Sequence, residues 1–232
     1  ITIHDVKSFS SVSSFTLYSR LIYFFSDTII THNEYSFKEI IEKNTSLSHK
    51  TSIIPHGNYL PFIKIKEDQN ASRIKLGIEK EKKVILSLPK VVEKHSSLVL
   101  LIAGKPWKDD FSYYQKLIDE LSISKYCKLD IKFISHSDVP YYYSAADIVI
   151  LPYRKIYQSG VLMMSLSYKK PVVVSNLPSF KEIIDNNSTG YIFESENSLD
   201  LSRVINKALD NPKLLEEIKE NGYNLIASDY KG

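Results

Sequence analysis

Residues 145–178 read AADIVILPYRKIYQSGVLMMSLSYKKPVVVSNLP, and their pattern decides the fold class. The continuous apolar run at 148–151 predicts a buried parallel strand. A polar loop, 153–159, leads to Gly160, after which apolar residues predict a helix as far as Tyr168. Pro171 ends that helix, and 172–174 predicts the next buried strand. This strand–loop–helix–strand unit is typical of a parallel α/β sheet.

The start of this predicted helix, at Ser159 and Gly160, is a candidate anion site. Unpaired backbone N–H groups and the helix dipole both favour negative charge at a helix N-terminus. Ligands of open α/β sheets bind at the carboxyl ends of the strands, which is where this loop lies. The unit therefore predicts a phosphorylated ligand, such as a nucleotide or a nucleotide conjugate.

The same alternation of strands and helices extends along the chain. Strand patterns occur at 27–32, 51–55, 83–86, 98–103, 131–134 and 190–193. Helical patterns occur at 15–26, 36–43, 88–95, 113–121, 139–145, 180–184, 199–209 and 212–225. Residues 59–70 lack periodicity and predict a linker between two domains. Strands that alternate with helices favour parallel sheets with right-handed crossovers, so we expect an α/β fold.

Composition narrows the classes of function. The 232 residues are 43% hydrophobic and 25% charged, which is typical of a globular protein with room for two small domains. The net charge of +3 comes from scattered lysines, which argues against nucleic-acid binding but permits contact with an anionic membrane surface. A single cysteine, Cys127, excludes an internal disulfide. With no signal peptide or membrane-spanning run in the sequence, we expect a cytoplasmic protein.

Seven short motifs, in order along the chain, resemble the retaining group-one glycosyltransferases (family 4 type) of the GT-B fold. They are Ile3-His4-Asp5, SDTIIT (26–31), IPHGN (54–58), LIAG (101–104), AADIVILP (145–152), 160–171 and 178–190. The resemblance implies two Rossmann-like domains that face each other across a cleft. We expect an incomplete N-terminal acceptor domain with its linker at 1–65, a donor domain at 66–215 and a C-terminal helix at 216–232 that returns to the N-terminal domain.

The resemblance also implies the reaction. A sugar would pass, with retention of configuration, from a UDP- or GDP-sugar to a glycan or lipid-linked acceptor in polysaccharide or glycoconjugate synthesis. No cofactor and no metal is expected, because the family stabilises the leaving diphosphate with cations, backbone N–H groups and a helix N-terminus. In this chain no spacing of His, Cys, Asp and Glu suggests a metal site. We expect an enzyme at the inner face of the membrane.

Candidate site residues follow from the same motifs. His4 is the catalytic candidate, and Asp5, His56 and Gly57 are expected at the cleft or acceptor side. Donor contacts are expected from Ser135, Arg154, Tyr157, Gln158, Ser159, Gly160, Val161 and Ser165. Tyr157 and Ser165 stand where the family usually has two glutamates. A serine accepts hydrogen bonds from ribose hydroxyls more weakly than a carboxylate and at shorter reach.

A basic pair typical of the family is absent. The resemblance implies an Arg and a Lys on the loop after the first strand of the donor domain, but Leu86 passes directly to Ser87-Leu88-Pro89. Either a segment that carries both cations is missing at this junction, or the chain lacks them. The alternative functions are therefore a non-catalytic GT-B subunit that binds a glycan or partner enzyme and, with a poorer match to the motif order, a nucleotide-sugar epimerase. A phosphorylase is not supported, since no lysine has the context of a pyridoxal site.

Overall fold

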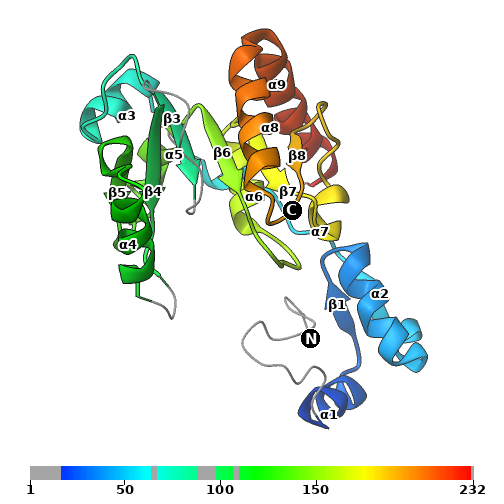
Figure 1. Ribbon diagram of the computed structural model, residues 1–232. Helices are drawn as coiled ribbons and strands as arrows, with labels where there is room; N and C mark the ends of the chain where they lie inside the picture. Colours follow the sequence, from blue (N-terminus) through cyan, green and yellow to red (C-terminus); the bar gives the residue numbers. More distant parts are fainter. Residues whose placement is uncertain (1–16, 64–66, 88–97, 107–109, 231–232) are drawn as a thin grey trace.

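The computed structural model describes residues 17–63, 67–87, 98–106 and 110–230, and it confirms an α/β fold with parallel sheets (Figure 1). The N-terminal segment, residues 17–53, contains α1 (Leu17–Phe25), β1 (Ile29–Thr31), α2 (Glu34–Lys43), the 3-10 helix η1 (Thr45–Lys50) and β2 (Thr51–Ile53). Strands β1 and β2 pair in parallel. The described residues from 67 to 230 form the C-terminal domain.

A six-stranded parallel sheet forms the centre of the C-terminal domain, with the strand order β5-β4-β3-β6-β7-β8. The strands are β3 (Lys83–Ser87), β4 (Leu98–Ala103), β5 (Cys127–Asp130), β6 (Ile148–Leu151), β7 (Val172–Ser175) and β8 (Tyr191–Phe193). The order reverses between β3 and β6, and such a switch point is where doubly wound sheets bind their ligands.

Helices cover both faces of this sheet (Figure 1). They are α3 (Gln69–Lys75), α4 (Ser112–Glu120), α5 (Val139–Ala145), α6 (Gly160–Ser167), α7 (Pro178–Lys181), α8 (Ser198–Asp210) and α9 (Pro212–Asp229). Successive strand residues point to opposite faces. Accordingly, Ile148 and Ile150 pack in one core cluster with α8 and α9, whereas Val149 and Leu151 pack in another with α6 and α7. All four residues of β6 are buried, as the apolar run predicted.

One strand was predicted in the wrong place. The pattern at 131–134 predicted a strand, but β5 occupies Cys127–Asp130. The pairing of β5 with β4 stops at Asp130, because β4 ends at its partner Ala103. The Gly104 N–H then donates to the Asp130 carbonyl at 3.1 Å. The apolar residues after Asp130 are therefore free to form a loop, and Phe133 is 73% exposed there.

Helix α3 was not predicted, whereas α9 confirms the helical pattern at 212–225. Helix α3 begins inside the expected linker, at Gln69, because Asp68 caps it by accepting a hydrogen bond from Ala71 N at 2.9 Å. Helix α9 runs unbroken through the boundary expected at residue 216. Its C-terminal end meets the connecting segment, the described residues 54–63 between the two parts, since Asn58 Nδ2 donates to the Ile226 carbonyl at 2.7 Å.

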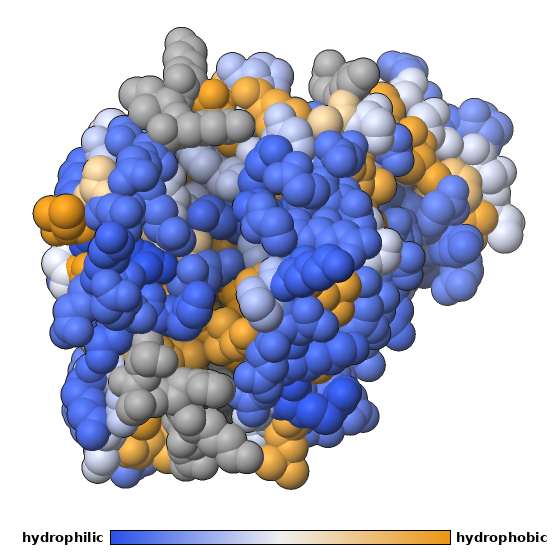
Figure 2. Space-filling view, turned by 90° about the horizontal axis from the view of Figure 1, so that it is seen from above, coloured by the Kyte–Doolittle hydropathy of each residue, from blue (hydrophilic) through white to orange (hydrophobic). Residues whose placement is uncertain are grey.

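Hydrophilic residues dominate the face seen in Figure 2, and apolar residues gather in the hollow between its two lobes. Several large apolar side chains are exposed, among them Phe24 and Phe25 on α1 and Phe62. Within the described ranges, none of the helices combines the length and the apolar character that crossing a membrane requires.

Candidate ligand-binding site

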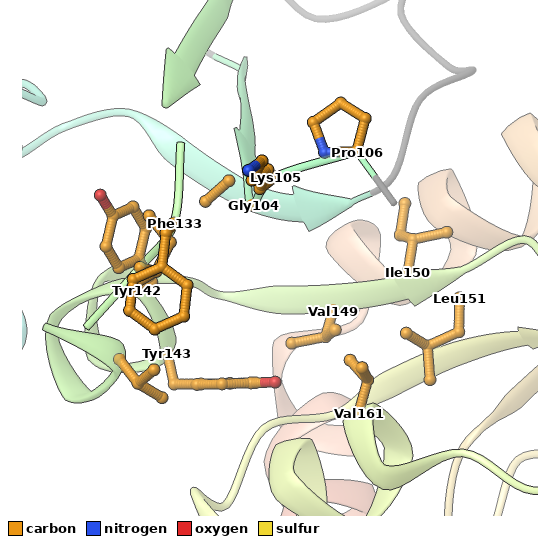
Figure 3. Close-up of a pocket in the computed structure, with 13 residues that line it drawn as sticks. Gly104, Lys105, Pro106, Phe133, Tyr142, Tyr143, Val149, Ile150, Leu151 and Val161 are labelled. Atoms are coloured by element: carbon orange, nitrogen blue, oxygen red, sulfur yellow. The ribbon is translucent and has the colours of Figure 1, made fainter. Parts of the chain in front are cut away.

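A cavity of about 590 Å³ opens at the carboxyl ends of β4 and β6 (Figure 3). Its wall comes from the ends of β4 and β6, the loop after β5, and helices α5 and α6. The lining residues are Ala103, Gly104, Lys105, Pro106, Phe133, Ile134, Val139, Tyr142, Tyr143, Val149, Ile150, Leu151 and Val161. The cavity therefore lies at the switch point of the sheet, as expected for a ligand site of this fold class.

The rim of this cavity is formed by the turn after β4. Gly104 has a φ of 130°, a conformation that residues with a Cβ rarely adopt, and a Cβ built there would meet no atom within 4 Å. Glycine is therefore required by the backbone and not by crowding. The next residue, Lys105, is exposed and is the only charged residue among the described residues of the lining. The site thus offers one cation beside mostly apolar walls.

Two tyrosines of α5, Tyr142 and Tyr143, line the cavity near Phe133 (Figure 3). The Tyr142 hydroxyl donates to Asp130 Oδ2 at 2.8 Å, and burial together with this carboxylate raises the pKa of Tyr142. Tyr143 stacks flat on Tyr168, with ring centroids 4.9 Å apart, and burial raises its pKa. Both phenols are therefore neutral at physiological pH, so their hydroxyls can hydrogen-bond to a ligand but carry no charge.

A second, smaller cavity of about 170 Å³ lies between the N-terminal segment and the start of α6. Its lining includes His32 and Glu34 from the N-terminal segment, His56 from the connecting segment, and Gln158, Ser159 and Glu182 from the C-terminal domain. The rings of His32 and His56 meet edge to face at 5.8 Å. The N-terminus of α6 thus separates two cavities, because Val161 lines the larger one and Ser159 the smaller one.

The expected helix start at Ser159 and Gly160 is present. Ser159 Oγ accepts a hydrogen bond from Leu162 N at 3.1 Å and so caps α6. A Cβ on Gly160 would lie 3.0 Å from the Tyr59 hydroxyl, so a larger residue there would press on that side chain. The smaller cavity is lined by Gln158, Ser159 and His56, and the larger one by Val161. A contact between these residues and a phosphate stays a prediction.

Two of the expected donor contacts need correction. Tyr157 is 1% exposed, and its hydroxyl donates to Glu39 Oε2 at 2.7 Å in the N-terminal segment. Ser165 is fully buried, and its Oγ donates to the Val161 carbonyl at 2.6 Å within α6. Both side chains are covered by protein, so neither presents its hydroxyl to a ligand in this structure.

The remaining candidates lie near the cavities or outside them. Arg154 forms an exposed ion pair with Glu196 at 2.9 Å and lines neither cavity. Ser135 Oγ donates to Asp138 Oδ2 at 2.7 Å, in the turn that leads from Ile134 into α5. Gly57 lines neither cavity, and its carbonyl lies 2.7 Å from His56 Nδ1. His4 and Asp5 fall outside the described residues.

Several lining residues were not predicted as site residues. Lys105, Phe133, Tyr142 and Tyr143 reach the cavity only because the turn after β4, the loop after β5 and α5 converge there. Gly104 could have been found from the sequence, since it ends the LIAG motif at a predicted strand end. Within the described part of the chain, no group of three or more His, Cys, Asp or Glu side chains is placed to hold a metal ion.

Comparisons with known proteins agree with this architecture. Residues 74–225 match the family model of glycosyl transferases group 1. Alpha-D-kanosaminyltransferase of Streptomyces kanamyceticus is 26% identical over 98 residues, 42% of this chain and 25% of that protein. The processive diacylglycerol alpha-glucosyltransferase of Acholeplasma laidlawii is 21% identical over 216 residues, 88% of this chain and 64% of that protein. The chain therefore spans less than two thirds of the length of either relative.

Solved structures show the same fold. A sucrose-phosphate synthase from Thermosynechococcus elongatus superposes with a TM-score of 0.80 at 16% identity, over 99% of this chain and 63% of that one. Anabaena HepE, solved in complex with UDP-glucose, gives a TM-score of 0.82 at 16% identity, over 99% of this chain and 67% of that one. These likenesses confirm the GT-B architecture expected from the motifs.

Proposed function

The chain belongs to the group 1 glycosyltransferases, and from this premise we propose that it moves a sugar from a nucleotide-diphosphate sugar to a glycan or lipid-linked acceptor. The observation that carries the proposal is the 590 Å³ cavity at the switch point of the sheet. Its apolar walls suit the flat face of a base, and Lys105 at the rim suits a phosphate. HepE, a structural neighbour, was solved with UDP-glucose, which supports the same class of ligand.

Phe133 is the group that we expect to contact the base. It is 73% exposed, yet it lines the cavity, so its ring is available for stacking. Retention of configuration and independence from metal are part of the proposal and rest on the resemblance of the motifs. A role in polysaccharide or glycoconjugate synthesis at a membrane rests on the same resemblance, and a diacylglycerol-modifying relative supports it.

Calorimetric titration of the full chain with UDP, UDP-glucose, GDP and GDP-mannose tests the donor. Removal of a stacking ring costs about 1–3 kcal/mol, so we expect Phe133→Ala to weaken the preferred nucleotide at least fivefold. Phe62→Ala is the matched control, because Phe62 is 76% exposed and lies outside both cavities. If no nucleotide binds the unmodified chain, or if the two variants lose affinity equally, the cavity is not the donor site.

A second candidate function is a non-catalytic GT-B subunit. It is favoured by Tyr157 and Ser165, which replace the two family glutamates and are both buried. Sugar transfer or hydrolysis by the purified chain, with UDP-glucose and GDP-mannose as donors, separates the two functions. Turnover by the chain alone excludes the subunit. Nucleotide binding with activity only after addition of a partner enzyme supports the subunit.

A further inference from the structure

Helix α2 of the N-terminal segment is capped by a residue of the C-terminal domain. Both carboxylate oxygens of Glu182 accept backbone hydrogen bonds, from Glu34 N at 2.9 Å and from Tyr35 N at 2.7 Å. These N–H groups open the helix and have no partner within it. A carboxylate at this position is stabilised by the helix dipole and by charge-assisted hydrogen bonds. The cap therefore joins the two parts of the chain.

Tyr157 makes the second connection, from the loop before α6. Its side chain is a member of the core cluster of the N-terminal segment, together with Tyr23, Ile29, Ile40 and Leu47. Its ring stacks on Tyr35, with centroids 5.7 Å apart and planes 24° apart. Its hydroxyl donates to Glu39 Oε2 at 2.7 Å. In this cluster of described buried residues, Tyr157 is the one member from the C-terminal domain.

The two connections share one end of α2. Asn33 is the N-cap of α2, where its Oδ1 accepts a hydrogen bond from Ser36 N at 2.8 Å. The Nδ2 of the same side chain donates to the Tyr157 carbonyl. The cap of α2 is thus bonded both to the loop before α6 and, through Glu34 and Tyr35, to Glu182 after α7.

The loop that carries Tyr157 leads directly to the ligand cavities. Gln158 and Ser159 follow it and line the smaller cavity, and Val161 in the first turn of α6 lines the larger one. The Asn33 and Glu182 contacts at α2 are polar, whereas Tyr157 is packed in the core cluster of the N-terminal segment. A shift of α2 would therefore be transmitted to the N-terminus of α6.

We propose that α2 is a latch, and that Tyr157 and Glu182 are positioning residues that fix the loop 153–159 and the start of α6 through it. Tyr157 thus positions the residues that line the cavities, although the family resemblance implies a donor contact at its place in the motif. The latch rests on protein contacts alone and goes beyond the proposed transferase function. Opening of one connection should loosen the other, because both reach Tyr35: Glu182 accepts from its N–H, and Tyr157 stacks on its ring.

Hydrogen–deuterium exchange of the full chain without nucleotide tests the latch. Tyr157→Phe keeps the ring and its stacking but removes the hydrogen bond to the Glu39 carboxylate. A hydrogen bond to a charged group contributes about 1.5–3 kcal/mol, so we expect exchange in segments 34–43 and 153–160 to rise roughly tenfold or more. Tyr113→Phe is the matched control, since Tyr113 is 61% exposed on α4, and should leave both segments unchanged.

Glu182→Ala tests whether α2 and the loop 153–160 are coupled, because a role confined to capping α2 would leave exchange in the loop unchanged. Loss of the cap should speed exchange in 34–43, where the Glu34 and Tyr35 N–H groups lose their acceptor, and also in the loop 153–160. Glu217→Ala, on the exposed side of α9, is its control. Faster exchange in 34–43 with an unchanged loop would refute the latch. So would Tyr157→Phe behaving like Tyr113→Phe.

Glu39→Gln keeps the proposal testable if Glu182→Ala does not fold, because it weakens the Tyr157 contact from the opposite side without change of shape. It should match Tyr157→Phe in both segments, and no effect would count against the latch. Calorimetric titration with UDP on the same proteins is read separately. Absence of nucleotide binding would refute the proposed donor site, whereas the exchange of the unliganded chain alone decides the latch.

Discussion

A buried ion pair joins α3 to the start of β6, and its contribution to the free energy of unfolding can be compared with that of an exposed pair. Arg73 NH2 lies 2.8 Å from Asp147 Oδ2, with side-chain exposures of 7% and 17%. The guanidinium also donates to the carbonyls of Ala145 at 3.2 Å and Lys80 at 2.6 Å. Arg154 and Glu196 are paired at a similar distance, 2.9 Å, but their exposures are 71% and 62%. The two pairs differ mainly in burial.

Burial should therefore decide what each arginine contributes. Arg73→Ala leaves the Asp147 carboxylate without its cation and two carbonyls without their donor, and breaking a buried pair in this way costs about 3–5 kcal/mol. Arg154→Ala removes a solvated pair, which is worth roughly 0–1 kcal/mol. For a chain of this length, 1 kcal/mol corresponds to about 2–4 °C in melting temperature. We expect Arg73→Ala to lower it by roughly 6–20 °C.

Urea denaturation followed by far-ultraviolet circular dichroism gives the free energy of unfolding of the unmodified chain and both variants. Thermal melts give the second measure. The denaturant slope should stay constant, so that a change in midpoint reports stability and not a change in exposed surface. If the two variants are destabilised equally, burial is not what makes the Arg73 pair strong, and the reasoning fails.

Three further predictions follow from burial and close packing. Burial lowers the pKa of Lys170 to about 8 from 10.5, so between these pH values the unfolded chain binds more protons than the folded chain, and stability rises with pH. At about 1.4 kcal/mol per pH unit, urea titrations at pH 8 and 10.5 should show the unmodified chain gaining roughly 3 kcal/mol more than Lys170→Met. Gly222→Ala should lower the melting temperature despite its better helix propensity, because the new Cβ would lie 2.9 Å from the Thr189 carbonyl oxygen, and an unchanged or higher value would contradict the close contact. Gly104→Val should weaken nucleotide binding and the fold together, since the added side chain strains a φ of 130°; equal affinity and equal melting temperature would show that the turn tolerates it.

Much of the fold was predictable because strands that are buried on both faces are continuously apolar. The runs at 148–151 and 172–174 became β6 and β7 for that reason. The error at 131–134 has an equally simple cause. A loop that lines a cavity also carries apolar side chains, and no local pattern separates it from a strand. Only the shared end of β4 and β5 at Ala103 and Asp130 does so.

The candidate site was predicted less well than the fold. The start of α6 could be read from Ser159 and Gly160, since capping is local chemistry. The roles of Tyr157 and Ser165 could not be read, because position in a motif does not say which neighbours cover a side chain. Tyr157 is covered by α2, which lies more than a hundred residues earlier in the chain, so its burial depends on how the two parts pack.

The sequence by itself determined the class of this protein: buried strands, capped helices and an ordered set of motifs at their ends specify a parallel α/β glycosyltransferase fold. These features are local, and each follows from the preferences of a few neighbouring residues. The tertiary structure alone decided that Gly104, Phe133 and Tyr143 share one cavity and that Tyr157 joins α2 to the loop before α6. Those contacts form between distant segments, and only the packing of the sheet and helices brings them within reach.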